Sequence, residues 1–410
     1  MNAARVAVTG IGVFCGAAPS SAAFREAVLN GVSGVGPVDL FDVSDFPARI
    51  AVQVKGYDPV LHFSRKQQQR LSRTDQFAVL AAAEALSMSN PAGSYDPYET
   101  GVCVGGGAAG MLQSEQWLEG HLRGAAVKPG LLRGVLPDRT ATELAHTFGL
   151  AGYQGSITTA CSSSSSAIGW GADLIRSGRQ KAMLCGGADS LCQLTFAGFN
   201  ALKVVDPEPC APFSLGRQGI TLGEGAAFVL LEDELAARQR GAEILGYVLG
   251  YALAGEAHHM TAPEPSGESA ARVMREALLD AGLEQTSIAW VNAHGTGTPL
   301  NDVVESNAMK LVFGERAAQV PLVSTKPITG HCLGAAGSIE AVATLLALNA
   351  ATIPQTLHFR GDDPDCDLDY CHSGSRPCGG RIALSNSFAF GGNITALALG
   401  AADLFPEVSR

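Results

Sequence analysis

One cysteine and two histidines stand where an expected strand gives way to an expected helix. Cys161 follows the run at 157–160, His294 follows the apolar run at 288–291, and His331 lies in STKPITGHCLGAAG. The N-terminus of a helix lowers the pKa of a thiol, so a cysteine at the position of Cys161 can be a thiolate near neutral pH. By residue type alone, Cys161 could equally be a buried structural cysteine. A thiol nucleophile with two imidazole donors suits acyl transfer and the stabilisation of an enolate.

The segments around these residues show which elements must position them. Short β-branched runs alternate with alanine-rich stretches, which indicates βαβ units whose sheets are covered by helices on both faces. Residues 157–161 lead into a small-residue helix, and residues 322–325 lead through KPITGH into a second one. Both helices are apolar almost all round, so we expect them to be buried between two mixed sheets. The repeat predicts a duplicated fold with halves at 1–242 and 243–410.

The composition argues against several classes of protein. The 28 basic and 39 acidic residues give a net charge of −11, which argues against nucleic acid or an anionic membrane as the main partner. The ten cysteines contain no CxxC pair and are expected to be reduced intracellular thiols. The most apolar stretch, residues 333–348, contains Glu340 and is too short to span a bilayer. We therefore expect a cytoplasmic protein without a signal peptide.

Two other kinds of site can be drawn from the sequence. Gly105, Gly107 and Gly110 match G-x-G-x-x-G after an expected strand. The acidic residue expected about 20 positions later is missing, and close backbone packing would explain these glycines equally well. Three cysteines and a histidine between residues 366 and 378 could be drawn as a zinc site, but their spacing is irregular. We expect neither a dinucleotide nor a metal.

Four motifs together resemble one known family. TTACSSS surrounds Cys161, HGTGTPLND surrounds His294, STKPITGHCLGAAG contains Lys326 and His331, and NSFAFGGN lies near the C-terminus. In this order and spacing they are similar to the motifs of the elongating β-ketoacyl-acyl carrier protein synthases of fatty-acid and polyketide assembly. The resemblance extends over nearly the whole chain. It implies a thiolase-like α/β fold, with duplicated halves in a five-layer α-β-α-β-α arrangement.

The resemblance implies a catalytic role for each matching residue. Cys161 would accept an acyl group from a phosphopantetheine thiol. His294 and His331 would support malonyl decarboxylation and stabilise the enolate. Lys326 resembles the structural lysine of the family. Glu340 is the expected ion partner of Lys326, since a buried lysine needs one.

A glycine-rich turn near the C-terminus completes the implied site. Phe390 in FAFGG resembles the gating phenylalanine, and its backbone N–H and that of Cys161 would form an oxyanion hole. The turn departs from the family's commonest pattern, which has glycine before this phenylalanine and Thr-Asn after the glycines. From residue type alone, the two threonines of HGTGT could equally be caps or turn residues. The implied substrate-binding residues are Thr296, Thr298, Ala108, Phe388 and Gly391.

The implied reaction is a decarboxylative Claisen condensation. An acyl thioester on Cys161 would react with malonyl-acyl carrier protein and so extend a fatty-acid or polyketide/polyene chain. The five serines after Cys161 resemble polyketide and polyene-type members of the family more than the fatty-acid ones. No metal or organic cofactor is implied, because the phosphopantetheine arm arrives with the carrier protein.

The expected partners are an acyl carrier protein and a second ketosynthase-like chain. Lys66, Arg70 and Arg73 in SRKQQQRLSR form the densest cationic cluster and are the predicted docking site, although a solvated helix face would look the same. The chain would form a homodimer, or a heterodimer with a chain-length subunit. Two alternatives stay open: a non-elongating chain-length subunit, which would lack Cys161, and a thiolase-type acyltransferase, which would need a second cysteine where His331 stands.

Overall fold

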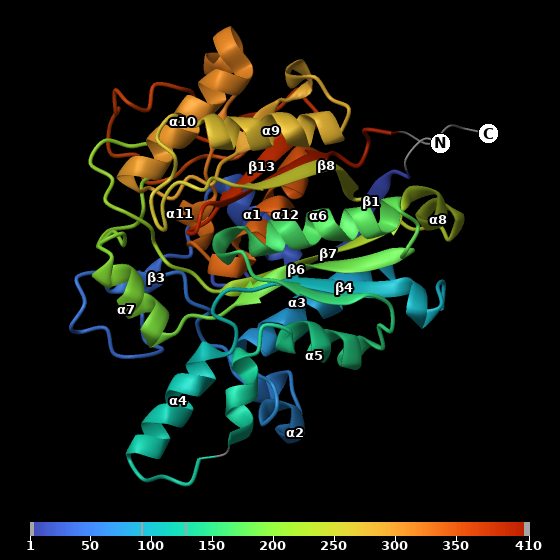
Figure 1. The fold of residues 1–410 in the computed structure, drawn as a ribbon, viewed down its shortest axis with the longest axis vertical. Coiled ribbons are helices and arrows are strands. Elements are labelled where there is room, and N and C mark those ends of the chain that lie inside the picture. Colours follow the sequence, from blue (N-terminus) through green and yellow to red (C-terminus); the bar gives the residue numbers. More distant parts are fainter. Residues whose placement is uncertain (1–3, 92, 128, 406–410) are drawn as a thin grey trace.

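The computed structural model describes residues 4–405 apart from residues 92 and 128, and its central feature is a mixed sheet (Figure 1). The strands of the first half are β1 (Val6–Cys15), β4 (Thr100–Gly105), β5 (Gln154–Ile157), β6 (Ala182–Asp189) and β7 (Gly225–Asp233). Those of the second half are β8 (Gly246–Gly255), β9 (Trp290–Asn292), β10 (Leu322–Val323), β13 (Ile382–Phe388) and β14 (Asn393–Gly400).

The order of the strands shows that the fold is duplicated. The sheet runs β10-β9-β13-β14-β8-β1-β7-β6-β4-β5. If the five strands of each half are numbered in chain order, both halves have the same arrangement from the centre of the sheet outward. The first strand is innermost and is followed by the fifth, fourth, second and third. The halves meet where β1 pairs with β8 through Val6–Val8, so the expected two sheets are hydrogen-bonded into one. Residue 242 falls between α8 (Glu234–Gln239) and β8, and the proposed division at that point stays a prediction.

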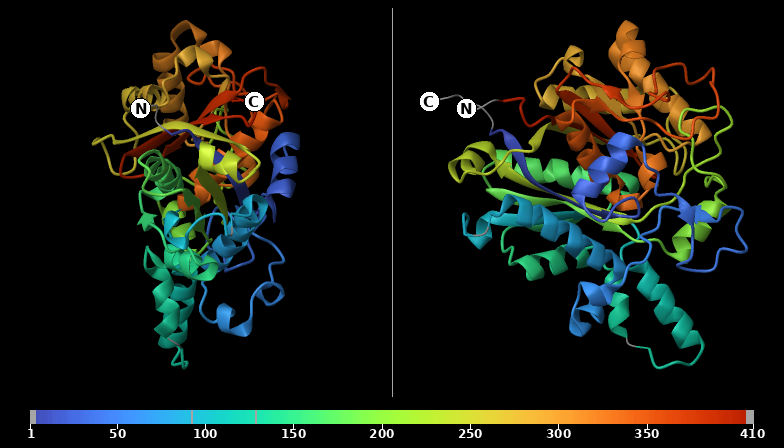
Figure 2. Two further views of the ribbon diagram at one scale, coloured as in Figure 1. Left: turned by 90° about the vertical axis from the view of Figure 1, so that its right-hand side faces the viewer. Right: turned by 180° about the vertical axis from the view of Figure 1, so that it is seen from behind.

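Helices lie in three layers around the two halves of the sheet (Figures 1 and 2). Helices α3 (Arg73–Ser89) and α5 (Arg139–Phe148) cover the outer face of the first half. Helices α9 (Glu268–Asp280) and α10 (Pro299–Phe313) lie on the outer side of the second half. Helices α6 (Ser163–Arg176) and α12 (Ala336–Asn349) pack against each other between the halves. The five-layer thiolase-like prediction is confirmed.

Small and hydroxylated side chains let the two central helices pack closely. A Cβ on Gly337 of α12 would stand 2.0 Å from Ser165 Oγ of α6, so only glycine fits that crossing. The buried serines do not remain unpaired. Ser165 Oγ lies 2.7 Å from Ser387 Oγ, and Ser166 Oγ lies 2.9 Å from Thr395 Oγ1. These hydrogen bonds offset the cost of burying the hydroxyl groups.

The remaining elements surround this core. Helix α4 (Met111–Leu122) projects from the body in all three ribbon views (Figures 1 and 2). Within the described residues, no helix is long and apolar enough to cross a membrane. The other helices are α1 (Ser21–Asn30), α2 (Arg65–Gln68), α7 (Gln193–Ala201) and α11 (Lys326–Thr329). The 3-10 turns are η1 (Pro59–Leu61), η2 (Pro97–Glu99), η3 (Pro129–Val135), η4 (Ala160–Ser162), η5 (Gln285–Ser287), η6 (Gly314–Gln319) and η7 (Leu333–Ala335). Two small ribbons pair β2 (Gly36–Pro37) with β3 (Ile50–Ala51) and β11 (Thr352–Ile353) with β12 (Arg376–Pro377).

Candidate active site

The three residues singled out for chemistry line one cavity. It has a volume of about 290 Å³, and most of its wall is apolar. Cys161 lies in η4, directly before α6, and the preceding Ala160 has a positive φ of 49°. His294 follows the end of β9, and His331 follows α11. Predicted residues that also line the cavity are Thr296, Thr298, Phe388 and Phe390.

Lys326 and Glu340 form the predicted ion pair, and both side chains are 1% exposed. The Lys326 ammonium also donates to the backbone oxygen of His294 and lies 3.4 Å from Nδ1 of that ring. Because an ammonium can only donate, Nδ1 of His294 accepts and the proton of the neutral ring is on Nε2. The lysine therefore sets the tautomer in which His294 is a donor at Nε2.

Burial keeps both imidazoles neutral. It lowers the pKa of His294 and of His331 well below the usual value, and the positive charge of Lys326 lowers both further. The two rings are 5.4 Å apart between centroids and nearly perpendicular. Nδ1 of His331 is buried without a hydrogen-bond partner among the described residues. Two neutral imidazoles beside a cysteine are suited to donate hydrogen bonds to a developing oxyanion.

The surroundings of Cys161 oppose the thiolate that a helix N-terminus would favour. Burial raises the pKa of Cys161 to about 12, because desolvation outweighs the nearby Lys326 charge. The charges of Asp189 and Glu340 raise this pKa further, while a hydrogen bond with the backbone of Phe390 lowers it. The cysteine is thus a thiol at neutral pH and must release its proton when it reacts. The Phe390 contact brings that backbone to the nucleophile, as the predicted oxyanion hole requires.

Glu305 was not predicted from the sequence. Its carboxylate accepts the backbone N–H groups of His294 at 2.8 Å and Gly295 at 2.9 Å, and the side-chain amide of Asn386 at 3.1 Å. Burial raises the pKa of Glu305 to about 7. Glu305 thereby holds the backbone of the histidine loop. Its position three residues after the ND of HGTGTPLND, in the first turns of a helix, is the signal that would have identified it.

Asp189, at the end of β6, is a second carboxylate that the sequence reasoning missed. It accepts the backbone N–H groups of Gly107, Ala108 and Ala109 at 2.8–2.9 Å and that of Gly334 at 2.7 Å. Burial raises its pKa to about 6. Sequence motifs do not show such a contact, because its partners come from two distant segments.

Two predicted substrate-binding residues do not line the main cavity. Ala108 packs against a cluster that includes Phe196 and Leu333. Gly391 donates its N–H to the oxygen of Met260 at 2.7 Å and so attaches the glycine turn to the loop at 256–263. Their proposed roles in acyl binding stay predictions. The glycines of the G-x-G-x-x-G match pack closely, since a Cβ on Gly105 would lie 2.3 Å from the backbone of α6.

The predicted docking cluster needs a correction. The side chain of Arg73 is 12% exposed and pairs with Glu224 at 2.6 Å, so its charge is not displayed at the surface. Arg70 pairs with Glu143 at 2.8 Å and is one-third exposed. Lys66 is exposed on α2. Arg73 is therefore removed from the docking cluster, because its charge is neutralised by the buried carboxylate of Glu224, the residue directly before β7.

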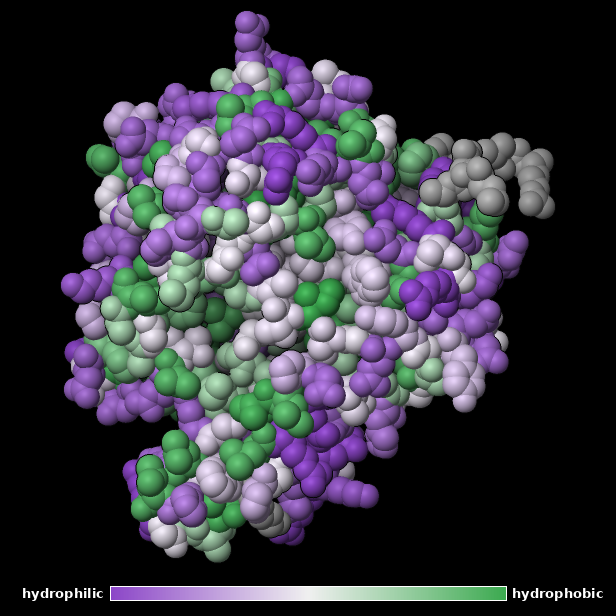
Figure 3. All heavy atoms as spheres, viewed as in Figure 1, coloured by the Kyte–Doolittle hydropathy of each residue, from purple (hydrophilic) through white to green (hydrophobic). Residues whose placement is uncertain are grey.

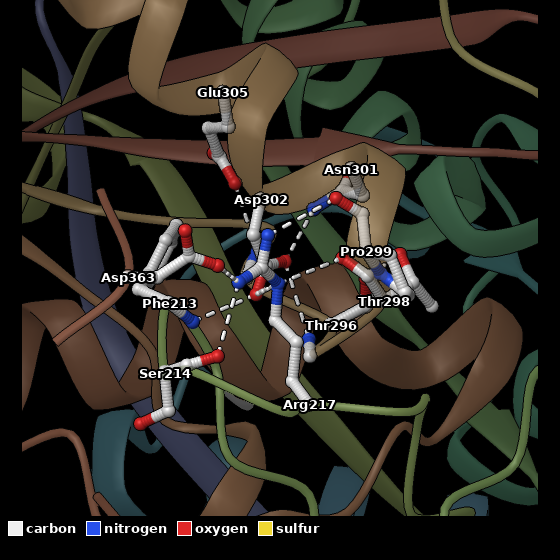
Figure 4. A network of polar contacts seen from close by, with 12 residues as sticks. Phe213, Ser214, Arg217, Thr296, Thr298, Pro299, Asn301, Asp302, Glu305 and Asp363 are labelled. Carbon is white, nitrogen blue, oxygen red and sulfur yellow. Dashed lines mark hydrogen bonds and ion pairs between the residues drawn. The ribbon is translucent and has the colours of Figure 1, made fainter. Parts of the chain in front are cut away.

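No group of metal-ligating side chains that could hold an ion is found among the described residues. A buried polar network lies next to the threonines of the cavity (Figure 4). At its centre the guanidinium of Arg217 lies between the carboxylates of Asp302 and Asp363. The sequence reasoning assigned no role to Arg217 or Asp302.

Comparisons with known proteins agree with this site. The family model "Beta-ketoacyl synthase, N-terminal domain" matches residues 3–237, and "Beta-ketoacyl synthase, C-terminal domain" matches residues 245–360. The chain is 36% identical over 404 residues to 3-oxoacyl-[acyl-carrier-protein] synthase 2 of Synechocystis sp., which covers 96% of this chain and 97% of that protein.

Two solved structures have the same fold over almost their whole length. The ishigamide ketosynthase/chain length factor has a TM-score of 0.91 at 35% identity, covering 97% of this chain and 99% of that one. A type II PKS ketosynthase, in complex with its acyl-carrier protein and bound to the hexaketide, has a TM-score of 0.88 at 31% identity, covering 98% and 100%. With two family models across most of its length and a relative 36% identical throughout, this chain belongs to the β-ketoacyl synthase family.

Proposed function

We propose that the chain is a β-ketoacyl-acyl carrier protein synthase that extends an acyl chain by decarboxylative condensation with malonyl-acyl carrier protein. The single observation that carries this proposal is the convergence of Cys161, His294 and His331 on one cavity, with both imidazoles neutral. The chain-length-subunit alternative would lack the nucleophile, and a thiolase would need a cysteine where His331 stands. Both alternatives are therefore disfavoured.

The first step transfers the acyl group to Cys161. The sulfur attacks the thioester carbonyl of the carrier-bound acyl group, and the proton lost by the thiol is taken up by the departing pantetheine sulfur. The oxyanion of the tetrahedral intermediate is held by the backbone N–H groups of Cys161 and Phe390. Collapse of the intermediate leaves an acyl-Cys161 and a free pantetheine thiol.

The second half-reaction forms the carbon–carbon bond. The malonyl carboxylate leaves as CO2, and its electron pair moves onto the thioester carbonyl to give an enolate. His294 and His331 donate hydrogen bonds from Nε2 to that oxygen, which is the role that Lys326 prepares through the tautomer of His294. The enolate carbon attacks the acyl-Cys161 carbonyl, and the Cys161 thiolate leaves and takes up a proton from the solvent.

The partners follow from the relatives. One related structure is named as a ketosynthase with its chain length factor and another as a ketosynthase with its acyl-carrier protein. We propose the same two classes of partner here, with a phosphopantetheine arm supplied by the carrier and no separate cofactor. The apolar side chains of α4, among them the exposed Leu118 and Leu122, support burial of this projecting helix by a second subunit (Figure 3). Location in the cytoplasm stays a prediction.

The test replaces the nucleophile. Cys161→Ala should form no acyl-enzyme and no condensation product, while malonyl-carrier decarboxylation continues because the two histidines remain. Cys378→Ala is the matched control, since Cys378 is also 7% exposed but lies outside the cavity. Intact-protein mass spectrometry measures acylation, and CO2 release measures decarboxylation. Full condensing activity in Cys161→Ala would contradict the proposal.

A further inference from the structure

The threonine pair of the cavity is held by a buried ionic network rather than by helix capping. Thr298 occupies the N-cap position of α10, but its side chain makes no capping hydrogen bond. Its Oγ1 instead lies 3.0 Å from Oγ1 of Thr296, and both residues line the cavity. The loop that carries these two hydroxyls therefore depends on other contacts for its conformation.

Those contacts come from one arginine of a distant loop. Arg217 Nε donates to the backbone oxygen of Thr298 at 3.2 Å, and its Nη2 donates to that of Pro299 at 3.1 Å. Its Nη1 donates to the backbone oxygen of Ser214 at 3.0 Å and to the carboxylate of Asp363. Figure 4 shows the guanidinium enclosed by these groups. The Arg217 side chain is 4% exposed, so the charge is held almost out of water.

Asp302 holds the same loop from the other side. Its carboxylate lies 3.4 Å from Arg217 Nε and accepts the N–H of Gly297 at 3.2 Å. Gly297 has a φ of +78°, and a Cβ there would stand 2.8 Å from the oxygen of Gly219. The segment between the two threonines is thus pressed against the arginine loop. The ion pair of Arg217 and Asp302 therefore holds this loop from both sides. Arg217 binds the carbonyl oxygen of Thr298, and Asp302 binds the N–H of Gly297.

We propose that Arg217 is a positioning residue that holds the hydroxyls of Thr296 and Thr298 ready to receive the phosphopantetheine arm of the substrate. This inference rests on the proposed function. An arm built of amide groups needs oriented hydrogen-bonding partners in a mostly apolar cavity, and fixing the hydroxyls beforehand reduces the entropy lost on binding. Arg217 has no place in the chemical steps at Cys161, and its loss should weaken binding of the arm rather than slow the chemistry.

The test separates binding of the arm from the reactivity of the nucleophile. In Arg217→Lys a point charge replaces the planar fork, so the bonds to Thr298 and Pro299 cannot both persist with the bond to Asp363. For acylation of Cys161 by an acyl-pantetheine thioester, we expect KM to rise at least tenfold, about 1.4 kcal/mol, with kcat within twofold. Alkylation of Cys161 by iodoacetamide, which carries no arm, should stay within twofold of wild type.

Arg360→Lys is the matched control. Arg360 pairs with Asp206 and bonds the oxygen of Pro209, so it attaches the same loop without contacting the threonine segment. The KM of Arg360→Lys for the acyl-pantetheine thioester should equal that of wild type. A double-mutant cycle of Arg217→Lys with Thr298→Ala should be non-additive in KM, because the arginine acts through the threonine.

Three results would overturn the inference. The first is an unchanged KM in Arg217→Lys, and the second is a raised KM accompanied by equal falls in kcat and in the alkylation rate. The third is a double-mutant cycle whose effects on KM are additive. If Arg217→Lys does not fold, Asp363→Asn decides the question. It removes one partner of the guanidinium and should raise KM about threefold, and an unchanged KM would refute the inference. If the wild-type protein forms no acyl-Cys161 with any pantetheine thioester, the proposed function itself fails, and this inference fails with it.

Discussion

Burial determines the protonation state of the groups around Cys161. It raises the pKa of the thiol to about 12 and the pKa values of Glu305 and Glu340 to about 7, and it holds His294 and His331 neutral. Such a site suits a reaction with anionic intermediates, because the two neutral imidazoles and the backbone N–H groups can donate hydrogen bonds to the developing oxyanion.

The raised pKa of Glu305 predicts that the free energy of unfolding depends on pH. Its folded-state pKa, about 7, lies above the ordinary 4.5, so the group stabilises the fold at low pH and this contribution is lost as pH rises through 7. Relative to Glu305→Gln, wild type should lose about 2–3 kcal/mol of unfolding free energy between pH 5 and pH 8. Urea denaturation at both values measures the difference. A wild-type advantage that grows with pH would contradict the shift.

At the scale of elements, the contact between α6 and α12 places the nucleophile. Cys161 lies in η4, which leads directly into α6, and the turn after His331 leads into α12, so the spacing of the two helices sets the spacing of the two side chains. The close approach at Gly337 and the Ser165–Ser387 hydrogen bond fix that spacing.

Gly337→Ala tests this contact. The added Cβ would displace Ser165 Oγ, and overpacking of this kind costs about 1–3 kcal/mol, more than the gain of up to about 1 kcal/mol in helix propensity. We expect a lower unfolding midpoint and slower acylation of Cys161. Gly198→Ala in α7 is the control, since a Cβ there meets nothing within 4 Å and should be neutral or stabilising. Equal stabilities for the two variants would show that the helices can separate at no cost.

At the scale of the whole molecule, the net charge is −11, so positive charge for the proposed carrier docking must be displayed locally. Arg73 and Arg70 are engaged with Glu224 and Glu143. Arg65 and Lys66 are both exposed on the short helix α2. The proposed docking site therefore stays within the segment SRKQQQRLSR that the sequence indicated, but it is centred on α2.

Reversing both charges of α2 tests the docking site. Arg65→Glu with Lys66→Glu should raise KM for carrier-bound substrate at least fivefold, and the effect should weaken with salt, because surface charges are screened. The KM for a free pantetheine thioester should not change. Arg179→Glu with Lys181→Glu is the matched control, since both residues are exposed beyond the far end of α6. If the control raises KM equally, the effect is one of net charge and α2 is not the docking site.

The sequence by itself determined the features that are local or repeated. The strand–turn–helix units around Cys161 and His331 predicted the duplicated layers. The family resemblance of Lys326, together with the need of a buried lysine for a counter-ion, predicted its ion pair with Glu340. Tertiary structure alone decided the charge states and the long-range partners. Arg73 meets a glutamate 151 positions away, and Arg217 meets an aspartate 146 positions away. Desolvation and such contacts arise only when distant segments close around a group, so no local pattern records them.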